Sequence, residues 1–123
     1  MYINKLSLDL VVNDVDASVD FYINILGFTK IEGDSHFAIL KAVSSEIMLM
    51  SKSDFDQEVP NNNRPQNQGW FVLIVEVPNI KEVYEKIKNK VKIIRELQST
   101  DYGTQEFLLT DLDGYYIQFT QRN

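Results

Sequence analysis

An internal repeat limits the folds open to this chain more than any other property of its sequence. Residues 102–119, YGTQEFLLTDLDGYYIQF, contain two β-rich runs around a turn with Gly114, which predicts a β-hairpin. An earlier segment matches this hairpin without a gap, at a constant offset in residue number, so that Phe37 aligns with Phe107 and Leu49 with Phe119. The repeat predicts two copies of one structural unit.

The beginnings of the two copies are related in the same way. Residues 5–12 and 71–77 alternate between two faces as half-buried strands do, with Leu6, Leu8 and Leu10 on the apolar face of the first and Phe71, Leu73 and Val75 on that of the second. Asp14 and Asn79 align with each other and are typical N-cap residues, and the apolar positions after each of them step by 4, 3 and 4 as in an amphipathic helix. Gly27 is expected to end the first helix. Further strands are expected at 28–31, 36–41 and 46–50, so each unit has the order βαβββ.

The offset between the copies is larger at the hairpin than at the helix, which indicates a five-residue insertion in the second copy, within residues 96–102. The length of 123 residues suits one domain. We expect a first module over residues 1–51, a long surface loop over residues 52–69, which are rich in Asn, Gln and Pro, and a second module over residues 70–123.

Composition excludes several classes of function. The net charge is −6 and no basic stripe is present, so a nucleic acid is a poor partner and a cationic ligand a better one. The chain has no cysteine, which excludes disulfides, thiolate catalysis and Cys-based metal sites. No apolar run is long enough to cross a membrane, and the N-terminus lacks the features of a signal peptide. We therefore expect a cytoplasmic protein.

Two motifs carry a resemblance to a known family: the segment DVDASVDFYINILGF, which begins at Asp14, and the DxDG turn that begins at Asp111. In a tandem βαβββ chain they resemble the vicinal oxygen chelate superfamily, which includes glyoxalase I, extradiol dioxygenases, fosfomycin resistance enzymes and bleomycin resistance proteins. Leu112 departs from the proline usual in the turn. The resemblance implies an α+β fold whose tandem βαβββ modules form a cup-shaped mixed sheet, with helices on the convex face and the ligand in the concave face.

The resemblance also implies where a metal would be held. Enzymes of the superfamily bind a divalent metal through residues of the first and last strands of each unit, positions that correspond here to Ser7, Met48, Val72 and Gln118. These side chains include no carboxylate or imidazole, the ligands that hard divalent ions prefer. We expect no metal and no cofactor. His36, the only histidine, is expected to be an ordinary residue at the start of a strand.

The strand alternation leaves one face of each sheet for the ligand. The expected ligand-binding residues of the cup are Ser7, Asp9, Met48, Met50, Trp70, Val72, Tyr102, Tyr116 and Gln118. Ile74 and Thr120 also fall on this face. If a reaction occurs, Asp9 is the best candidate for a general base, ahead of Glu76 and Glu106, because it lies in the middle of its strand beside Ser7.

These observations favour a metal-free protein that binds a small molecule, resembling the bleomycin resistance proteins, which sequester a cationic drug in grooves of a homodimer. Aromatic and methionine side chains would suit a planar or cationic compound such as an antibiotic. Two alternatives stay open. The first is a lyase, isomerase or dioxygenase-related enzyme with non-standard site residues, and the second is a structural or regulatory homodimer whose cup is filled by its own side chains.

Overall fold

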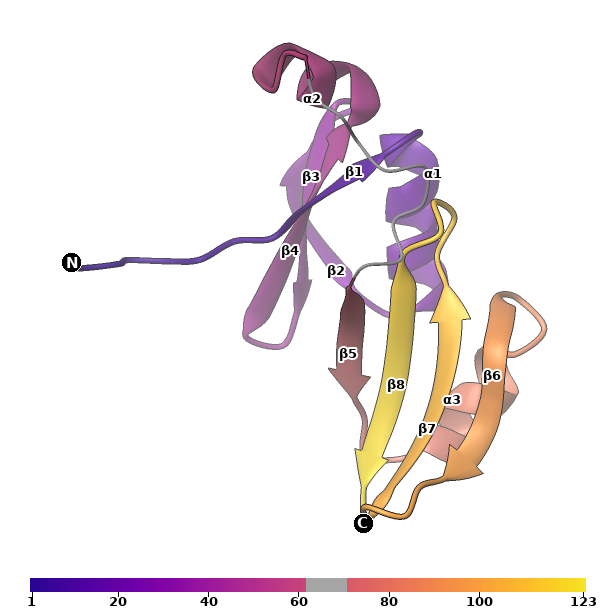
Figure 1. The fold of residues 1–123 in the computed structure, drawn as a ribbon. Helices are drawn as coiled ribbons and strands as arrows, with labels where there is room; N and C mark the ends of the chain where they lie inside the picture. The colour runs from indigo at the N-terminus through magenta and orange to yellow at the C-terminus, as the bar shows by residue number, and fades with distance from the viewer. Residues whose placement is uncertain (62–70) are drawn as a thin grey trace. The chain divides into compact units, whose positions relative to one another are not determined.

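The computed structural model describes residues 1–61 and 71–123 and has an α+β fold (Figure 1). Two compact units divide the chain, Met1–Arg64 and Pro65–Asn123, which we call the first and second units. The elements of the first unit are β1 (Asp9–Val12), α1 (Val15–Asp20), the π-helical turn η1 (Phe21–Ile25), β2 (Thr29–Gly33), β3 (Phe37–Ala42), β4 (Ser45–Ser51) and α2 (Lys52–Glu58). Those of the second unit are β5 (Val72–Glu76), α3 (Ile80–Ile87), β6 (Lys92–Ser99), β7 (Thr104–Thr110) and β8 (Tyr116–Arg122).

Each unit forms a four-stranded mixed sheet with the predicted βαβββ order. The strand orders are β1-β4-β3-β2 and β5-β8-β7-β6, and in each sheet the first strand is parallel to the last while the other pairs are antiparallel. The parallel pairs are in equivalent registers, because Asp9 is opposite Met48 and Ile74 is opposite Gln118. Asp9 and Ile74 are separated by the same offset as the two helices, and Met48 and Gln118 by the same offset as the last strands of the two hairpins. This agreement confirms the repeat.

The hairpin repeat is not free of gaps, contrary to the prediction. Ala38 is opposite Leu49 in the first sheet, whereas Phe107 is opposite Phe119 in the second, so Ala38 and not Phe37 is the equivalent of Phe107. Between the equivalent ladder pairs Lys41–Glu46 and Thr110–Tyr116 the chain of the second hairpin is one residue longer, so the offset between the copies changes across the turn. A shift of one residue exchanges the two faces of a strand, and accordingly Ala38 is buried while Phe37 is only half-buried.

The predicted insertion lies in the hairpin of β6 and β7. The strand registers show that it is one residue longer than the five residues expected. Lys30 is opposite Leu40, and the equivalent pair in the second sheet is Ile93 with Leu109. The chain between the paired positions is therefore longer in the second hairpin than in the first. A register shift between Arg95 and Gln98 and the turn that follows Ser99 accommodate the extra residues.

The helices begin where the sequence predicts. The Asp14 carboxylate accepts a hydrogen bond from the Ala17 amide at 3.0 Å, and the Asn79 side chain accepts one from the Glu82 amide at 3.3 Å. Gly27, with φ of 84°, follows the first helical segment as expected. The last helical turn of this segment widens into η1, and its consecutive rings Phe21 and Tyr22 are both buried.

Two expectations at the ends of the first module are wrong. The strand predicted over residues 5–12 begins only at Asp9, and Leu6 and Leu8 precede it as exposed side chains. The loop predicted over residues 52–69 begins instead with α2, because the Ser51 hydroxyl caps the Asp54 amide at 3.1 Å and starts a helix. Residues 62–69 of that segment lie outside the described residues.

The core of each unit lies between its sheet and a helix. In the second unit α3 covers one face of β7 and β8 (Figure 1). The Tyr84 ring packs edge-on against Phe107, and Phe107 stacks on Phe119, with 5.0 Å between the ring centroids in each pair. In the first unit α1 packs on β3 and β4. One face of each sheet is therefore committed to the core, and the alternate side chains point to the opposite face, which we call the open face.

Candidate functional site

The open face of the second sheet carries three rows of side chains that run across the strands. The ladders place opposite one another Val72, Tyr116, Thr110 and Lys92 in one row, Ile74, Gln118 and Leu108 with Arg95 in the next, and Glu76, Thr120, Glu106 and Gln98 in the third. Ile74 and Val72 are 66% and 46% exposed, although their neighbours in β5 are half-buried. An apolar edge thus lies beside a polar centre.

Glu106 is the centre of the polar part of this face. Its side chain is only 6% exposed, and a buried carboxylate needs partners to offset the loss of hydration. The Tyr102 hydroxyl donates to the two carboxylate oxygens at 3.0 and 3.1 Å, and the Thr104 hydroxyl donates to Oε2 at 2.9 Å. The Arg95 Nη2 atom lies 3.6 Å from Oε1. Glu106 is therefore fixed by short bonds from hydroxyl groups and by a longer ion pair.

Arg95 and Gln118 continue the network across the sheet. Arg95 Nη2 donates to Gln118 Oε1 at 3.4 Å, and Gln118 Nε2 donates to the Thr120 hydroxyl at 3.1 Å. The Gln118 amide is held at both of its ends. The Arg95 Nε atom is buried and has no hydrogen-bond partner among the described residues.

Tyr102 lies in the turn between β6 and β7 and is 68% exposed, with its hydroxyl directed at Glu106. The hydrogen bond to this carboxylate, followed by desolvation and the negative charge of Glu106, raises the pKa of Tyr102 above its usual value. The hydroxyl is accordingly a donor at neutral pH. Gly103, with φ of 89°, follows it in the turn.

The open face of the first sheet has a different character. Asp9 is opposite Met48, and Val11 is opposite Met50, so these side chains form a mostly apolar surface around one carboxylate. Desolvation of the carboxyl group, followed by the negative charge of Glu58, raises the pKa of Asp9, although much of the residue's surface is exposed. Ser7 precedes β1 and is exposed.

The four positions that correspond to metal ligands do not form a site for a hard divalent ion. Val72 has no donor atom, Met48 offers a thioether, and the Gln118 amide is already bonded to Arg95 and Thr120. Ser7 offers one neutral hydroxyl. Among the described residues, no three His, Cys, Asp or Glu side chains come together in a way that would hold a metal. The donor set therefore does not fit the metal of the superfamily's enzymes.

His36 and Glu76 each form an ion pair at the surface. The His36 Nδ1 atom is 3.5 Å from an Asp54 carboxylate oxygen, just before β3, and both side chains are well exposed. Glu76 pairs with Arg122 at 3.3 Å. These pairs are surface contacts, which contribute little to stability.

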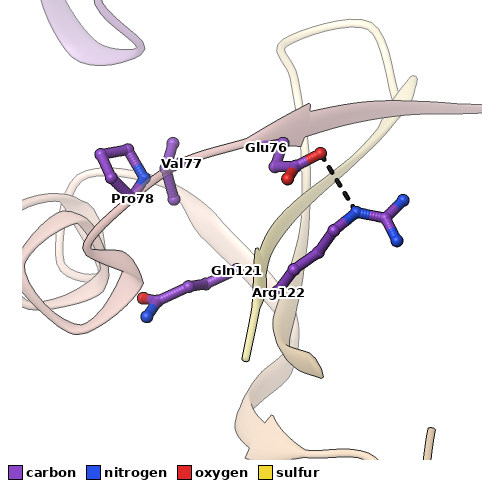
Figure 2. Close-up of a pocket in the computed structure, with 5 residues that line it drawn as sticks. All are labelled: Glu76, Val77, Pro78, Gln121 and Arg122. Carbon is purple, nitrogen blue, oxygen red and sulfur yellow. Dashed lines mark hydrogen bonds and ion pairs between the residues drawn. The ribbon is translucent and has the colours of Figure 1, made fainter. Parts of the chain in front are cut away.

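One hollow of about 420 Å³ lies at the ends of β5 and β8 (Figure 2). Its lining residues are Glu76, Val77, Pro78, Gln121 and Arg122. The pair of Glu76 and Arg122 forms one side, and Gln121 Oε1 accepts a hydrogen bond from the Ile80 amide at 2.7 Å, which caps α3. Gln121 thus has a structural role, and no other side chain that lines the hollow suggests a reaction or a bound ligand.

The predicted binding residues fall into separate groups. Tyr102 and Gln118 belong to the polar network, Val72 and Tyr116 lie in the row beside it, and Asp9, Met48 and Met50 share the open face of the first sheet. Trp70 lies outside the described residues. Arg95 and Thr104 are not among the binding residues expected from the sequence. The alternation along β7 could have indicated Thr104, because Thr104 and Glu106 lie on the opposite face of the strand from the core residue Phe107.

Comparison with known proteins identifies the family. The profile of the Glyoxalase/Bleomycin resistance protein/Dioxygenase superfamily matches residues 3–119. A bleomycin resistance protein of Geobacillus stearothermophilus is 29% identical over 123 aligned positions, which cover 92% of this chain and 92% of the relative. The chain belongs to the glyoxalase, bleomycin resistance protein and dioxygenase superfamily.

Solved structures show the same fold. A protein of unknown function from Agrobacterium tumefaciens has a TM-score of 0.86 at 18% identity, with coverage of 100% of this chain and 97% of that chain. A glyoxalase/bleomycin resistance protein/dioxygenase from Nocardioides has a TM-score of 0.77 at 18% identity, with coverage of 99% and 86%. Within residues 1–61 and 71–123, no helix has the length and apolar character to cross a membrane.

Proposed function

We propose that this protein binds a small cationic or aromatic compound, such as an antibiotic, without using a metal, and acts by sequestering it. The donor set at the four metal-ligand positions carries this proposal. Gln118, the only one of the four residues with an amide, is tied to Arg95 and Thr120, and Met48 and Val72 are poor ligands for hard ions. Such a site retains the surface for a ligand but lacks the electrophile of the metalloenzymes.

The open face of the second sheet supports ligand binding. Ile74 and Val72 are exposed apolar side chains beside the ring of Tyr116 and the polar network of Glu106. Small-molecule sites combine apolar surface with a few well-oriented polar groups in this way. The net charge of −6 favours a cationic compound through long-range attraction.

Assembly and location are part of the same proposal. We expect a homodimer in the cytoplasm, in line with the resemblance to bleomycin resistance proteins. Native mass spectrometry of protein purified without chelators is expected to show a dimer without stoichiometric metal. One divalent ion per chain would contradict the proposal and favour the alternative of a lyase, isomerase or dioxygenase-related enzyme.

Isothermal titration calorimetry with metal-free bleomycin tests ligand binding. We expect the Ile74→Ser variant to bind about tenfold more weakly than the wild type, because an isoleucine covered by ligand contributes on the order of 1.5 kcal/mol or more. Leu112→Ser is a matched control, since Leu112 is 58% exposed but lies in the turn after β7.

Equal losses in the two variants would contradict a binding surface at Ile74. No binding of bleomycin to the wild type would remove this drug as the ligand. If the purified protein also carries no small molecule, this result favours the alternative of a structural or regulatory homodimer.

A further inference from the structure

The Arg95 side chain reaches across the open face of the second sheet. Arg95 lies on the edge strand β6, where Leu108 is its partner in the ladder, and Gln118 is the next residue in that row. The 3.4 Å contact of Arg95 Nη2 with Gln118 Oε1 therefore spans the strand between them. The guanidinium group lies over the middle of the sheet, next to the residue that occupies a metal-ligand position in related enzymes.

The hydrogen-bonding capacity of this guanidinium is poorly used by the protein. An arginine has five N–H donors, and within the described part of the chain both polar contacts of Arg95 use the same atom, Nη2. These contacts are long, at 3.4 and 3.6 Å. The Nε atom is buried without a partner, although an unpaired buried donor is costly. The Arg95 side chain is nevertheless 40% exposed, so part of it can be reached from outside.

Glu106 does not provide a close acceptor for the unused N–H groups of Arg95. Its oxygens accept the bonds from Tyr102 and Thr104 at 2.9 to 3.1 Å, all shorter than the 3.6 Å separation from Arg95. Glu106 thus lies beside the cation, but its shorter bonds come from the two hydroxyl groups and its contact with Arg95 is the longest of the four. The arrangement fixes the guanidinium in place and leaves it without a close acceptor.

We infer that Arg95, whose guanidinium group lies beside Gln118, is the recognition point for a carboxylate group on the ligand. The inference rests on the proposed function and narrows the ligand class to aromatic or apolar carboxylates. A carboxylate matches the planar donors of arginine in a bidentate manner, with charge-assisted bonds that a neutral amide does not make. The exposed side chains of Ile74 and Val72 would contact the apolar part of the ligand.

The net charge of −6 opposes the approach of a carboxylate only weakly at physiological ionic strength. Surface charges farther away than about 8 Å are largely screened at physiological ionic strength, whereas the guanidinium would touch the carboxylate directly. A ligand with a cationic group elsewhere in the molecule would satisfy both the long-range field and Arg95.

The test compares 2-naphthoate with its neutral analogue 2-naphthamide by titration calorimetry. We expect the wild type to bind the carboxylate at least about tenfold more tightly than the amide, because only the carboxylate forms charge-assisted bonds. In a ¹H–¹⁵N spectrum of labelled protein, 2-naphthoate is expected to shift the Nε–H resonance of Arg95 and to leave that of Arg122 in place.

Three variants locate the effect. Arg95→Gln should lose the preference for the carboxylate, and Arg95→Lys should lose most of it, since lysine keeps the charge next to Glu106 but lacks the planar donors. Arg122→Gln is the matched control, because it removes the same charge from an arginine that is 74% exposed and paired with Glu76. Thermal melting of each variant checks that it is folded, and Arg95→Lys keeps the test valid if Arg95→Gln does not fold.

The inference is overturned if the wild type binds the two compounds equally, if it binds 2-naphthoate undetectably, or if Arg122→Gln loses as much preference as Arg95→Lys. Retained preference in a folded Arg95→Lys variant would also overturn it. If 2-naphthamide or metal-free bleomycin still binds under any of these outcomes, the proposed function stands without the inference. If none of the three compounds binds, the proposed function fails as well.

Discussion

At the scale of single residues, Glu106 and Glu76 form a natural comparison. Each glutamate pairs with an arginine across the second sheet, at 3.6 Å for Glu106 with Arg95 and 3.3 Å for Glu76 with Arg122. The surroundings differ, since the Glu106 side chain is 6% exposed and accepts bonds from Tyr102 and Thr104, whereas that of Glu76 is 57% exposed. Removing the Glu106 carboxylate takes the acceptor from the Tyr102 and Thr104 hydroxyls and from Arg95, whereas water replaces the partner in the surface pair of Glu76.

We therefore expect Glu106→Ala to lower the free energy of unfolding by about 3 kcal/mol and Glu76→Ala by less than about 1 kcal/mol. Urea denaturation of the two variants in parallel measures the difference. Similar values for the two variants would show that the Glu106 network is open to water.

Tyr102 gives a prediction on pH dependence. Its pKa is raised in the folded state, first by the hydrogen bond to Glu106 and then by desolvation, so the folded protein holds this proton more tightly than the unfolded chain. The associated stabilisation is fully present below the pKa of the unfolded chain, about 10, and is lost as the pH rises through the folded pKa.

Wild type and Tyr102→Phe are expected to differ in stability at neutral pH and to converge in alkaline solution. Denaturation at a series of pH values measures this, and taking the difference between the two proteins removes the contribution of Lys88, whose pKa is also raised, by Glu85. A constant difference across the alkaline range would show that the Tyr102 hydroxyl does not bind Glu106 in solution.

At the scale of elements, the end of β2 depends on one glycine. Gly33 has φ of 150° and lies opposite Ala38 in the ladder with β3. A Cβ atom at this position would be 2.5 Å from the Phe37 carbonyl oxygen and 2.7 Å from the Ala38 Cα atom. These neighbours are backbone atoms, which cannot move aside without disturbing the sheet.

Gly33→Ala is expected to destabilise the protein by about 2–3 kcal/mol, through strain and the close approach. Gly103→Ala, at φ of 89° with no atom within 4 Å of the added Cβ, should cost only about 1 kcal/mol. Chemical denaturation of both variants measures the two losses. If Gly103→Ala were as destabilising as Gly33→Ala, the close approach at β3 would not be the cause.

The elements also show where sequence reasoning succeeds and where it does not. Asp14 and Asn79 predicted the starts of α1 and α3 because a cap bonds to amides only two or three residues away. The start of α2 at Ser51 follows the same rule, but the polar composition of the segment that follows favoured a loop. The predicted alignment of β3 with β7 was wrong by one residue. The length of a turn changes the register of the strands beside it but has little effect on the hydrophobic pattern.

At the scale of the whole molecule, net charge is the property that acts on a distant ligand. A chain with a net charge of −6 attracts cationic compounds through a field that dissolved salt screens. Raising the ionic strength from about 10 mM to about 150 mM shortens the Debye length from about 30 Å to about 8 Å.

Metal-free bleomycin, as a cationic ligand, is therefore expected to bind several-fold more weakly at the higher ionic strength, and 2-naphthamide to bind equally at both. Titration calorimetry at the two salt concentrations measures this. If bleomycin bound equally well in the two buffers, contacts alone and not the net charge would determine its affinity.

The sequence by itself determined the repeat, the order βαβββ, the helix caps and the family, because each depends on local spacing or on residues close together in the chain. It also determined that the four metal-ligand positions lack carboxylates and imidazoles. The tertiary structure alone decided which polar side chains meet. Arg95, Glu106 and Gln118 lie on three different strands, and their contact depends on strand order, register and the bulge in β6, all of which are set by packing across the sheet and not by neighbours in the chain.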